Sequence, residues 1–206
     1  EDKAFIRDDG TSGTPKGLKF WINPLNKLAA NGTVSLANVT TDLGRMVQAI
    51  MSADIPLIVQ QNQGNGNGAV TDVRPGWIMS PRTYRYLTTV QTTTGVYAYR
   101  DEMLRGTLWG WPYRVTTQVL ETMTAGGADT GGNQSELYFG AFAHAVIGEA
   151  LGVMVDASQE AAYHDGTSVV ASFSQDQTVV RVLAEHDFAL RHDKAFTLLQ
   201  NMTWGV

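Results

Sequence analysis

Four histidines are the first residues to consider for chemistry, because imidazole binds metals and transfers protons near neutral pH. They are His144, His164, His186 and His192, and no two stand four residues apart, as a helical metal site requires. On a strand, His186 and His192 would share a face but lie about 20 Å apart. The chain has no cysteine, which excludes thiolate ligands, cysteine nucleophiles and disulfides. We predict surface or interface histidines and no metal site.

The segment Thr11–Leu18, TSGTPKGL, is a second candidate for chemistry. A turn rich in glycine, serine and threonine can bind phosphate through its backbone N–H groups. The segment resembles the phosphate-contacting loop of adenylate-forming enzymes, but it lacks two residues of that motif, and such enzymes need a much longer chain. We interpret it as a connecting turn. Adenylation is kept as the weak enzymatic alternative, which calorimetry with ATP tests.

The remaining candidates for catalysis are weak. Gly64–Gly68 holds a G-x-G, but no later glycine at dinucleotide-binding spacing opens a helix. There is no G-x-S-x-G motif, and Ser80 before Pro81 is typical of a helix N-cap. Two carboxylate pairs, Asp8–Asp9 and Asp101–Glu102, are neighbours in sequence, so they are expected on a solvated surface. We therefore predict no enzyme and no catalytic, cofactor-binding or metal-binding residues.

Trp109 and Trp111 flank Gly110 and suggest either of two functions. Paired indoles can form a platform on which a sugar or a base stacks. Aromatic residues are also enriched in buried cores and at the centres of subunit interfaces, which is the interpretation we favour. The binding-module alternative predicts a monomer whose tryptophan fluorescence is quenched when sugar is titrated.

Composition restricts the classes of partner. Among 206 residues, 43% are hydrophobic and only 17% are charged, and the chain has 21 glycines and five tryptophans. Such a sparsely charged chain suits a protein that covers much of its surface with neighbours. A net charge of −5 argues against tight, sequence-independent binding of nucleic acid, which depends on Lys and Arg. No apolar run is long enough for a membrane span, and EDKAFIRDDG lacks the apolar core of a signal peptide.

Two helices are predicted in the first half of the chain. Apolar residues recur at helical spacing from Leu43 to Met51, and Thr40-Thr41-Asp42 offers an N-cap, with an end near Ala53. The second helix begins at Pro81 and ends near Thr89. Two segments predict exposed loops through their low complexity or glycine content, namely Gln60–Gly68 and Ala125–Asn133. Leu57-Ile58-Val59 is either a short buried strand or the start of a loop.

The second half of the chain is predicted to be rich in strands, which gives an α/β (α+β) fold class. A strand opens at Trp77 and another covers Tyr113–Thr117. Val179–Leu190 alternates well enough for one long strand. Shorter strands are predicted at Leu137–Gly140, Ala145–Ile147, Val153–Val155, Val169–Phe173 and Phe196–Leu199.

An ordered set of motifs identifies a family resemblance. Trp77-Ile78-Met79-Ser80-Pro81 is followed by Gly95-Val96-Tyr97 and then by Leu108-Trp109-Gly110-Trp111-Pro112. This order resembles the "W-x-M-[NS]-P", "G-x-Y" and "L-x-G-x-P-V" segments of Hong Kong 97-like major capsid proteins of tailed bacteriophages, with Tyr113 in place of Val. Asp8–Leu18 resembles the family's "G-D-G-T-G-x-P-x-G-[IL]" loop. Tyr138–Phe142 and Gln177–Phe196 resemble its closing motifs, with Ala141 in place of Asp.

The resemblance implies a division into two domains. Residues 25–138 and 193–206 would form an axial domain. Residues 1–24 and 139–192 would be the remaining part of a peripheral domain, in which Val179–Leu190 anchors the sheet. The resemblance also implies that the N-terminal arm, the extended loop and the spine helix are absent from this fragment. Gln60–Gly68 and Asp101–Arg105 are then candidates for contacts near the symmetry axes.

The function that the resemblance implies is self-assembly. Copies of the subunit would form hexamers and pentamers of an icosahedral shell in the virion, assembled in the bacterial host cytoplasm around double-stranded DNA that it does not bind sequence-specifically. Portal protein, scaffolding protein or a protease are possible partners, and no membrane is involved. Alternatives are a shell protein of an encapsulin or gene-transfer particle, or a small-ligand or carbohydrate-binding module using Trp109 and Trp111.

Overall fold

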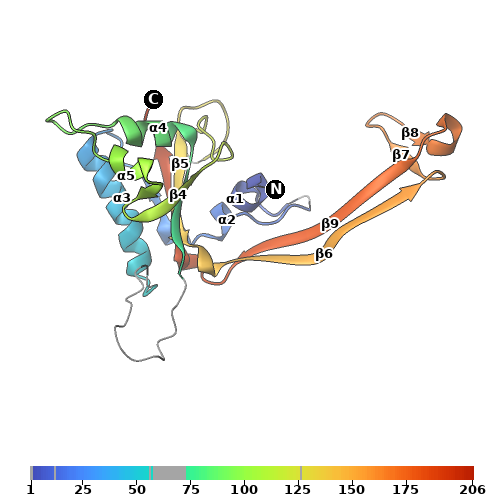
Figure 1. Cartoon of the computed structure of the whole chain (residues 1–206), viewed down its shortest axis with the longest axis horizontal. Helices are drawn as coiled ribbons and strands as arrows, with labels where there is room; N and C mark the ends of the chain where they lie inside the picture. Colours follow the sequence, from blue (N-terminus) through green and yellow to red (C-terminus); the bar gives the residue numbers. More distant parts are fainter. Residues whose placement is uncertain (1, 12, 56, 58–72, 126) are drawn as a thin grey trace. The chain divides into compact units, whose positions relative to one another are not determined.

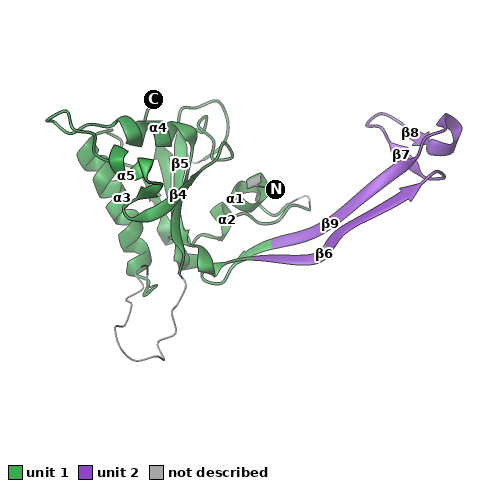
Figure 2. Ribbon diagram, in the orientation of Figure 1, with its two compact units in different colours: residues 1–146, 188–206 green, residues 147–187 purple. Residues whose placement is uncertain are grey.

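The chain forms two compact units. The computed structural model describes residues 2–11, 13–55, 57, 73–125 and 127–206. Unit 1 comprises residues 1–146 and 188–206, and unit 2 comprises residues 147–187 (Figures 1 and 2). The predicted loop at Gln60–Gly68, and Ile58 and Val59 before it, lie outside the described residues. The axial and peripheral ranges named above stay a prediction.

Unit 1 is built around a six-stranded mixed sheet. Its strand order is β1 (Lys27–Ala29), β10 (Phe196–Met202), β5 (Ser135–Ala141), β2 (Pro75–Met79), β4 (Trp111–Val115) and β3 (Thr107–Leu108). The pairs β1–β10 and β2–β4 are parallel, and the other pairs are antiparallel. Every residue of the central strand β5 is buried, because helical segments pack on both faces of the sheet.

Helices lie on both sides of this sheet. Figure 1 shows α3 (Leu36–Met51) and α5 (Arg100–Leu104) on one side, and α1 (Asp2–Arg7) and α2 (Leu18–Trp21) on the other. The apolar side of α3 is fully buried through Val39, Leu43, Met46 and Ile50 and packs on β10 and β5. The helix α4 (Pro81–Thr89) follows β2 directly. Burial of these side chains is the main stabilising contribution to unit 1.

The predicted start of the first helix was wrong. Helix α3 begins at Leu36, and the side chain of Ser35 caps it by accepting a hydrogen bond from the Asn38 backbone N–H. Asp42 lies inside the helix and is fully buried. Its carboxylate accepts hydrogen bonds from the backbone N–H and the side-chain amide of Asn31, at 2.9 and 2.6 Å. Aspartate is a common helix-capping residue, but here Asp42 binds the loop at Asn31 and caps no helix end.

The second helix was predicted correctly. Strand β2 ends at Met79, and α4 begins at Pro81 and ends at Thr89. Ser80 is the N-cap, because its hydroxyl accepts a hydrogen bond from the Thr83 backbone N–H at 3.2 Å. Proline at the first helical position fits this geometry, since its missing N–H would have had no helical partner.

Unit 2 consists of most of two long paired strands and a small hairpin beyond them. The long strands are β6 (Ala145–Ser158) and β9 (Val179–Leu190), and the hairpin joins β7 (Ala162–His164) to β8 (Val169–Ala171). The bounds of β9 confirm the predicted long strand. The segments Ala145–Ile147 and Val153–Val155 are strand as predicted, but they belong to one strand, because Gly148 and Gly152 between them continue it.

Several short elements escaped prediction. These are α1, α2, α5, β1, β3, β7 and the four 3₁₀ turns η1 (Pro24–Asn26), η2 (Phe142–His144), η3 (Ser172–Gln175) and η4 (Asp193–Ala195). Other strands extend beyond the predicted bounds or stop short of them: β5 and β10 are longer, while β8 ends at Ala171. Segments of two to six residues carry too little periodicity to indicate their structure.

Candidate functional site

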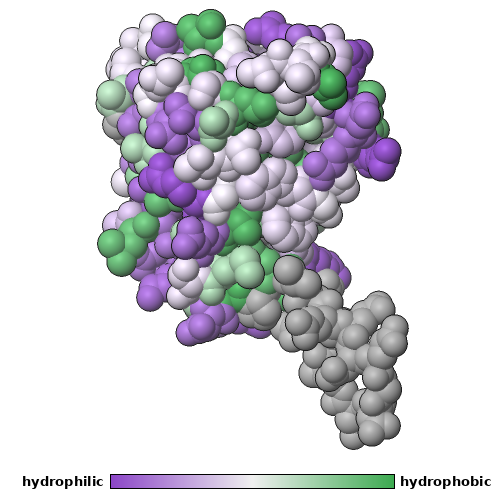
Figure 3. All heavy atoms as spheres, turned by 90° about the vertical axis from the view of Figure 1, so that its left-hand side faces the viewer, coloured by the Kyte–Doolittle hydropathy of each residue, from purple (hydrophilic) through white to green (hydrophobic). Residues whose placement is uncertain are grey.

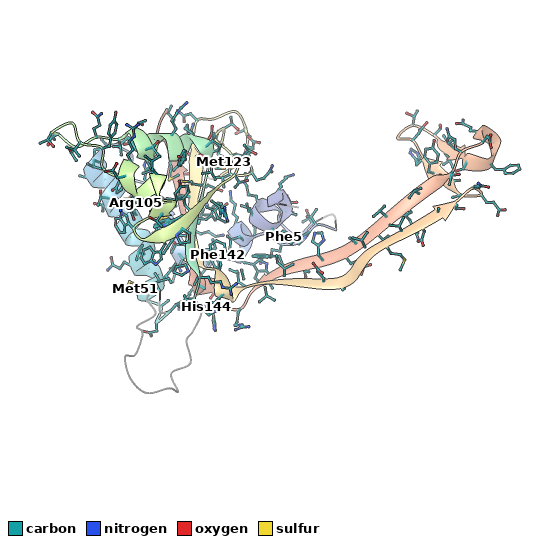
Figure 4. The ribbon with its side chains drawn as sticks, in the orientation of Figure 1. Phe5, Met51, Arg105, Met123, Phe142 and His144 are labelled. Carbon is teal, nitrogen blue, oxygen red and sulfur yellow. The ribbon has the colours of Figure 1, made fainter. Side chains whose placement is uncertain are left out.

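The histidines form one pair that the sequence did not reveal. The rings of His144 and His192 pack edge to face with centroids 5.0 Å apart, where η2 and η4 meet. The Nδ1 atom of His144 is buried without a hydrogen-bond partner. Burial, then the neighbouring His192 and Arg191, lowers the pKa of His144 below its ordinary value of 6.5. Figure 4 shows His144 near Phe142.

No metal-binding cluster accompanies this pair. Across the ranges that the structure describes, no three His, Asp or Glu side chains lie close enough together to hold an ion. His164 is used locally, since its Nδ1 accepts a hydrogen bond from the Gly166 backbone N–H at 3.0 Å. Nor is any helix of the described part of the chain long and hydrophobic enough to span a bilayer.

The phosphate-loop candidate is a closed turn bonded to itself. The Asp9 carboxylate accepts hydrogen bonds from the Thr11 backbone N–H and hydroxyl, at 3.0 and 2.6 Å, which lower the pKa of Asp9. The Lys16 amine lies 4.3 Å from the centroid of the Trp21 ring, a cation–π contact. Gly17 packs directly against the backbone of α1, where a Cβ would stand 2.7 Å from the Ala4 carbonyl oxygen. These contacts fit a connecting turn.

Trp109 and Trp111 do not form a shared platform. Trp109 has a positive φ of 54°, and its ring reaches Gly44 of α3. The Trp111 ring packs against Phe139, with centroids 5.1 Å apart. Both side chains are half-buried against the core. This placement matches the structural interpretation of the two tryptophans.

The paired carboxylates are also used locally or exposed. Glu102 accepts a hydrogen bond from the Gly110 backbone N–H at 2.6 Å and so fixes the turn between β3 and β4. Asp101 beside it is exposed. The Asp8 carboxylate lies 3.6 Å from the Lys3 amine on the surface. Neither pair places two carboxyl groups around a common cavity, which an acid–base site would need.

A buried ionic cluster joins the N-terminal segment to the sheet, and sequence reasoning missed it. Glu136 on β5 is 1% exposed and pairs with the Lys19 amine from α2. Its other carboxylate oxygen accepts a hydrogen bond from the Tyr138 hydroxyl at 2.7 Å. The Lys19 amine also donates to the Gly127 carbonyl at 3.2 Å. Burial and Glu136 together raise the pKa of Tyr138.

An apolar groove with a volume of about 870 Å³ lies in unit 1. Strands β2 and β4 form its floor, and Ile6 of α1 and Phe142 of η2 line it as well. Its charged residues are Arg74 and Arg114, with no carboxylate. The groove contains no nucleophile beside a base, so its chemistry is that of a docking surface.

Unit 2 presents a second apolar surface, here called the valine face. The Arg181 guanidinium and the Asp156 carboxylate are 2.9 Å apart, so these two side chains share one face of the β6–β9 pair. Side chains alternate along a strand, which places the neighbouring valines on the opposite face. This face consists of Val153, Val155, Val180 and Val182, exposed by 73%, 62%, 59% and 62%.

Two surfaces suited to contact, and no reaction centre, therefore emerge from the described residues. Comparison with known proteins identifies the family. The model of the "Phage capsid family" matches residues 1–201. The chain belongs to the phage capsid family. The family resemblance inferred from the motifs is thus confirmed, and so is the mixed fold class.

Individual relatives support this assignment. The chain is 37% identical over 202 residues to a protein named "Major capsid protein" from Klebsiella oxytoca phage phiKO2. The match covers 96% of this chain and 42% of that protein, so the chain spans less than half of the relative's length.

Solved structures match in fold. A chain from Mycobacterium phage Adephagia gives a TM-score of 0.58 at 13% identity, over 96% of this chain and 59% of that one. A chain from the capsid of an empty GTA particle gives 0.62 at 14% identity, over 96% and 60%. A chain from Gordonia phage Cozz gives 0.58 at 16% identity, over 97% and 57%.

Proposed function

We propose that this member of the phage capsid family is part of a major capsid protein, whose copies assemble into the hexamers and pentamers of an icosahedral shell. The observation that carries the proposal is 37% identity to a named major capsid protein along 96% of the chain. The shell would enclose double-stranded DNA in the virion. A net charge of −5 fits enclosure better than tight binding of that DNA.

The valine face supports a function in which the protein contacts other subunits. A two-stranded hairpin is marginally stable by itself, and four valines at least 59% exposed would leave this one with an uncovered apolar surface. In an assembled shell, further protein would cover the face. Many modest contacts of this kind become stable together in a closed, symmetric assembly. The proposal assigns no catalytic role to any residue.

The test is negative-stain electron microscopy of the protein expressed in its full native length, alone and with the products of neighbouring genes, because scaffolding or portal proteins are candidate partners. We expect uniform closed shells. Soluble monomers under both conditions would contradict the proposal and leave the family membership as a matter of fold.

A gene-transfer particle is the second candidate, because a GTA capsid is among the structures of the same fold. Sequencing the DNA inside purified shells separates the two: one defined phage genome indicates a virion, and assorted host fragments indicate a transfer particle. The carbohydrate-binding alternative is not favoured, since Trp109 packs against Gly44 of α3 and Trp111 against Phe139 of β5.

A further inference from the structure

The groove lies on one face of the sheet, and the position of its floor follows from strand register. In the parallel pair β2–β4, Trp77 is opposite Tyr113 and Ile78 is opposite Arg114. Trp77 and Tyr113 point toward α5, since the Trp77 Nε1–H donates to the Leu108 carbonyl and the Tyr113 hydroxyl to the Met103 carbonyl. Alternation places Ile78 and Arg114 on the other face, which is the groove.

Helix α1 covers only part of that face. Ile6 of α1 and Phe142 of η2 line the groove beside strands β2 and β4. Gly76 lets the Phe142 ring pack closely against the floor, because a Cβ there would lie 3.3 Å from that ring. The groove is therefore apolar in its floor and walls, with guanidinium groups as its only charges.

Arg114 is the charged residue of the groove that is free to bind a partner. Its side chain is exposed, and within the described residues it has no hydrogen bond or ion pair. An exposed apolar groove with an uncompensated cation fits a ligand that brings apolar side chains and a carboxylate together.

The opposite side of unit 1 carries a segment with exposed apolar side chains and a carboxylate. It comprises residues 96–104 and is here called the α5 knob. Three of its large hydrophobic side chains are exposed: Val96 by 62%, Tyr97 by 41% and Leu104 by 69%. No other stretch of this length in the described part of unit 1 exposes as many. Figure 3, which faces the side of α3 and α5, shows hydrophobic residues there as small patches among polar ones.

The knob also carries an uncompensated carboxylate. Asp101 is exposed and, among the described residues, has no hydrogen bond or ion pair. Two neighbouring charges are engaged, since the Arg100 guanidinium lies over the Tyr97 ring at 4.5 Å and Glu102 accepts a hydrogen bond from the Gly110 backbone N–H. Arg105, next to Leu104, is exposed. Asp101 and Leu104 are three residues apart on one helical turn, so they present a charge and an apolar group side by side.

We infer that the groove of one subunit receives the α5 knob of a second copy of this chain. Leu104 would enter the apolar groove and Asp101 would pair with Arg114 of the neighbour. Because knob and groove lie on opposite sides of one sheet, the contact is head to tail, the type that forms a ring when the rotation between neighbouring subunits closes. This inference rests on the proposed function and identifies residues that would join adjacent subunits within a ring.

The experiment uses the full-length protein and charge reversal, with shell yield measured by sedimentation and electron microscopy. Arg114→Asp and Asp101→Arg should each lower the yield of closed shells at least about tenfold, because each places two like charges in the contact. The double variant Asp101→Arg/Arg114→Asp should recover most of the yield. Arg85→Asp is the matched control, since Arg85 is an exposed arginine on α4 outside the groove, and it should assemble like the wild type.

A covalent trap provides the second measurement. The chain has no cysteine, so Leu104→Cys with Ile78→Cys introduces one thiol on the knob and one on the floor of the groove. Under oxidising conditions we expect the two-cysteine variant to give a ladder of covalent oligomers on a non-reducing gel. Each single-cysteine variant should stay monomeric there, because it lacks the second thiol that the head-to-tail contact would bring close.

The outcomes separate the two ideas. The knob-in-groove contact is overturned, with shell formation intact, if both charge reversals leave the yield of shells unchanged. It is also overturned if the double variant does not recover the yield and the two-cysteine variant gives no ladder. A wild type that forms no shells would contradict the proposed function. In that case a ladder from the two-cysteine variant would still support the contact, and its absence would dismiss the contact as well.

Discussion

Replacing Lys19 by methionine should strongly destabilise unit 1. The substitution keeps most of the apolar stem of the side chain but removes the amine that faces Glu136 and Gly127. Glu136 is 1% exposed, so water cannot replace the lost partner, and its remaining hydrogen bond comes from Tyr138. Breaking a buried ion pair by removing one partner costs about 3 to 5 kcal/mol, because the other charge stays buried without compensation.

Urea denaturation followed by tryptophan fluorescence measures this effect. All five tryptophans, Trp21, Trp77, Trp109, Trp111 and Trp204, belong to unit 1, so the signal reports the unit that contains the ion pair. With a urea dependence of about 2 kcal/mol per M, the loss corresponds to a midpoint lower by about 1.5 to 2.5 M.

Two further variants make the result specific. Lys3→Met removes an exposed lysine that is 3.6 Å from Asp8, and it should change the free energy of unfolding by less than about 1 kcal/mol. Lys19→Met/Glu136→Gln removes both charges and should restore most of the stability. A Lys19→Met midpoint within about 0.5 M of the wild type, or a double variant no more stable than Lys19→Met, would refute the reasoning.

Three other perturbations have defined outcomes. Gly140→Ala should lower the free energy of unfolding by about 3 kcal/mol or more, because the new Cβ would stand 2.1 Å from the Phe196 ring, whereas Gly32→Ala meets nothing within 4 Å; equal urea midpoints for the two would contradict this. Ser80→Ala should lower it by about 1 kcal/mol through loss of the α4 N-cap, and Ser80→Asp should retain more of the stability; a loss equal in both would show that the cap is unimportant. Because the folded state lowers the pKa of His144, the stability that this neutral side chain contributes is fully present above pH 6.5 and declines as the pH falls through that value toward the lower folded pKa. The melting temperature of His144→Gln should therefore fall less than that of the wild type between pH 7.5 and 5.5, and identical declines would refute this.

Sequence reasoning found the elements whose patterns are long or chemically distinct. Ser80-Pro81 marked the start of α4 because a capping hydroxyl and a proline act within one turn of backbone. The alternation from Val179 to Leu190 gave the bounds of β9. At Asp42 the same reasoning failed, because the residue's partner, Asn31, lies in another loop that folding brings near. Local rules do not register such a tertiary hydrogen bond.

The candidate surfaces were harder to anticipate than the fold. The Asp101–Arg105 segment was expected among the contact regions, whereas the groove was not, since it depends on β2 and β4 pairing in parallel and on α1 stopping short of them. The pairing of His144 with His192 and of Lys19 with Glu136 joins residues 48 and 117 positions apart. No local pattern in the sequence encodes separations of that size.

The hairpin of unit 2 has a consequence for how such chains diverge. The chain enters and leaves unit 2 through β6 and β9, which are already joined at their base where the Arg191 backbone N–H donates to the His144 carbonyl at 2.8 Å. Residues can therefore be gained or lost at the far end without altering the register of the six-stranded sheet. Because side chains alternate, changes that preserve the valine face must come as two residues on each strand, which lengthens the hairpin by about 7 Å. During evolution the strands of unit 2 should therefore change length in steps of two residues. Related chains should differ by even numbers of residues in each of these strands.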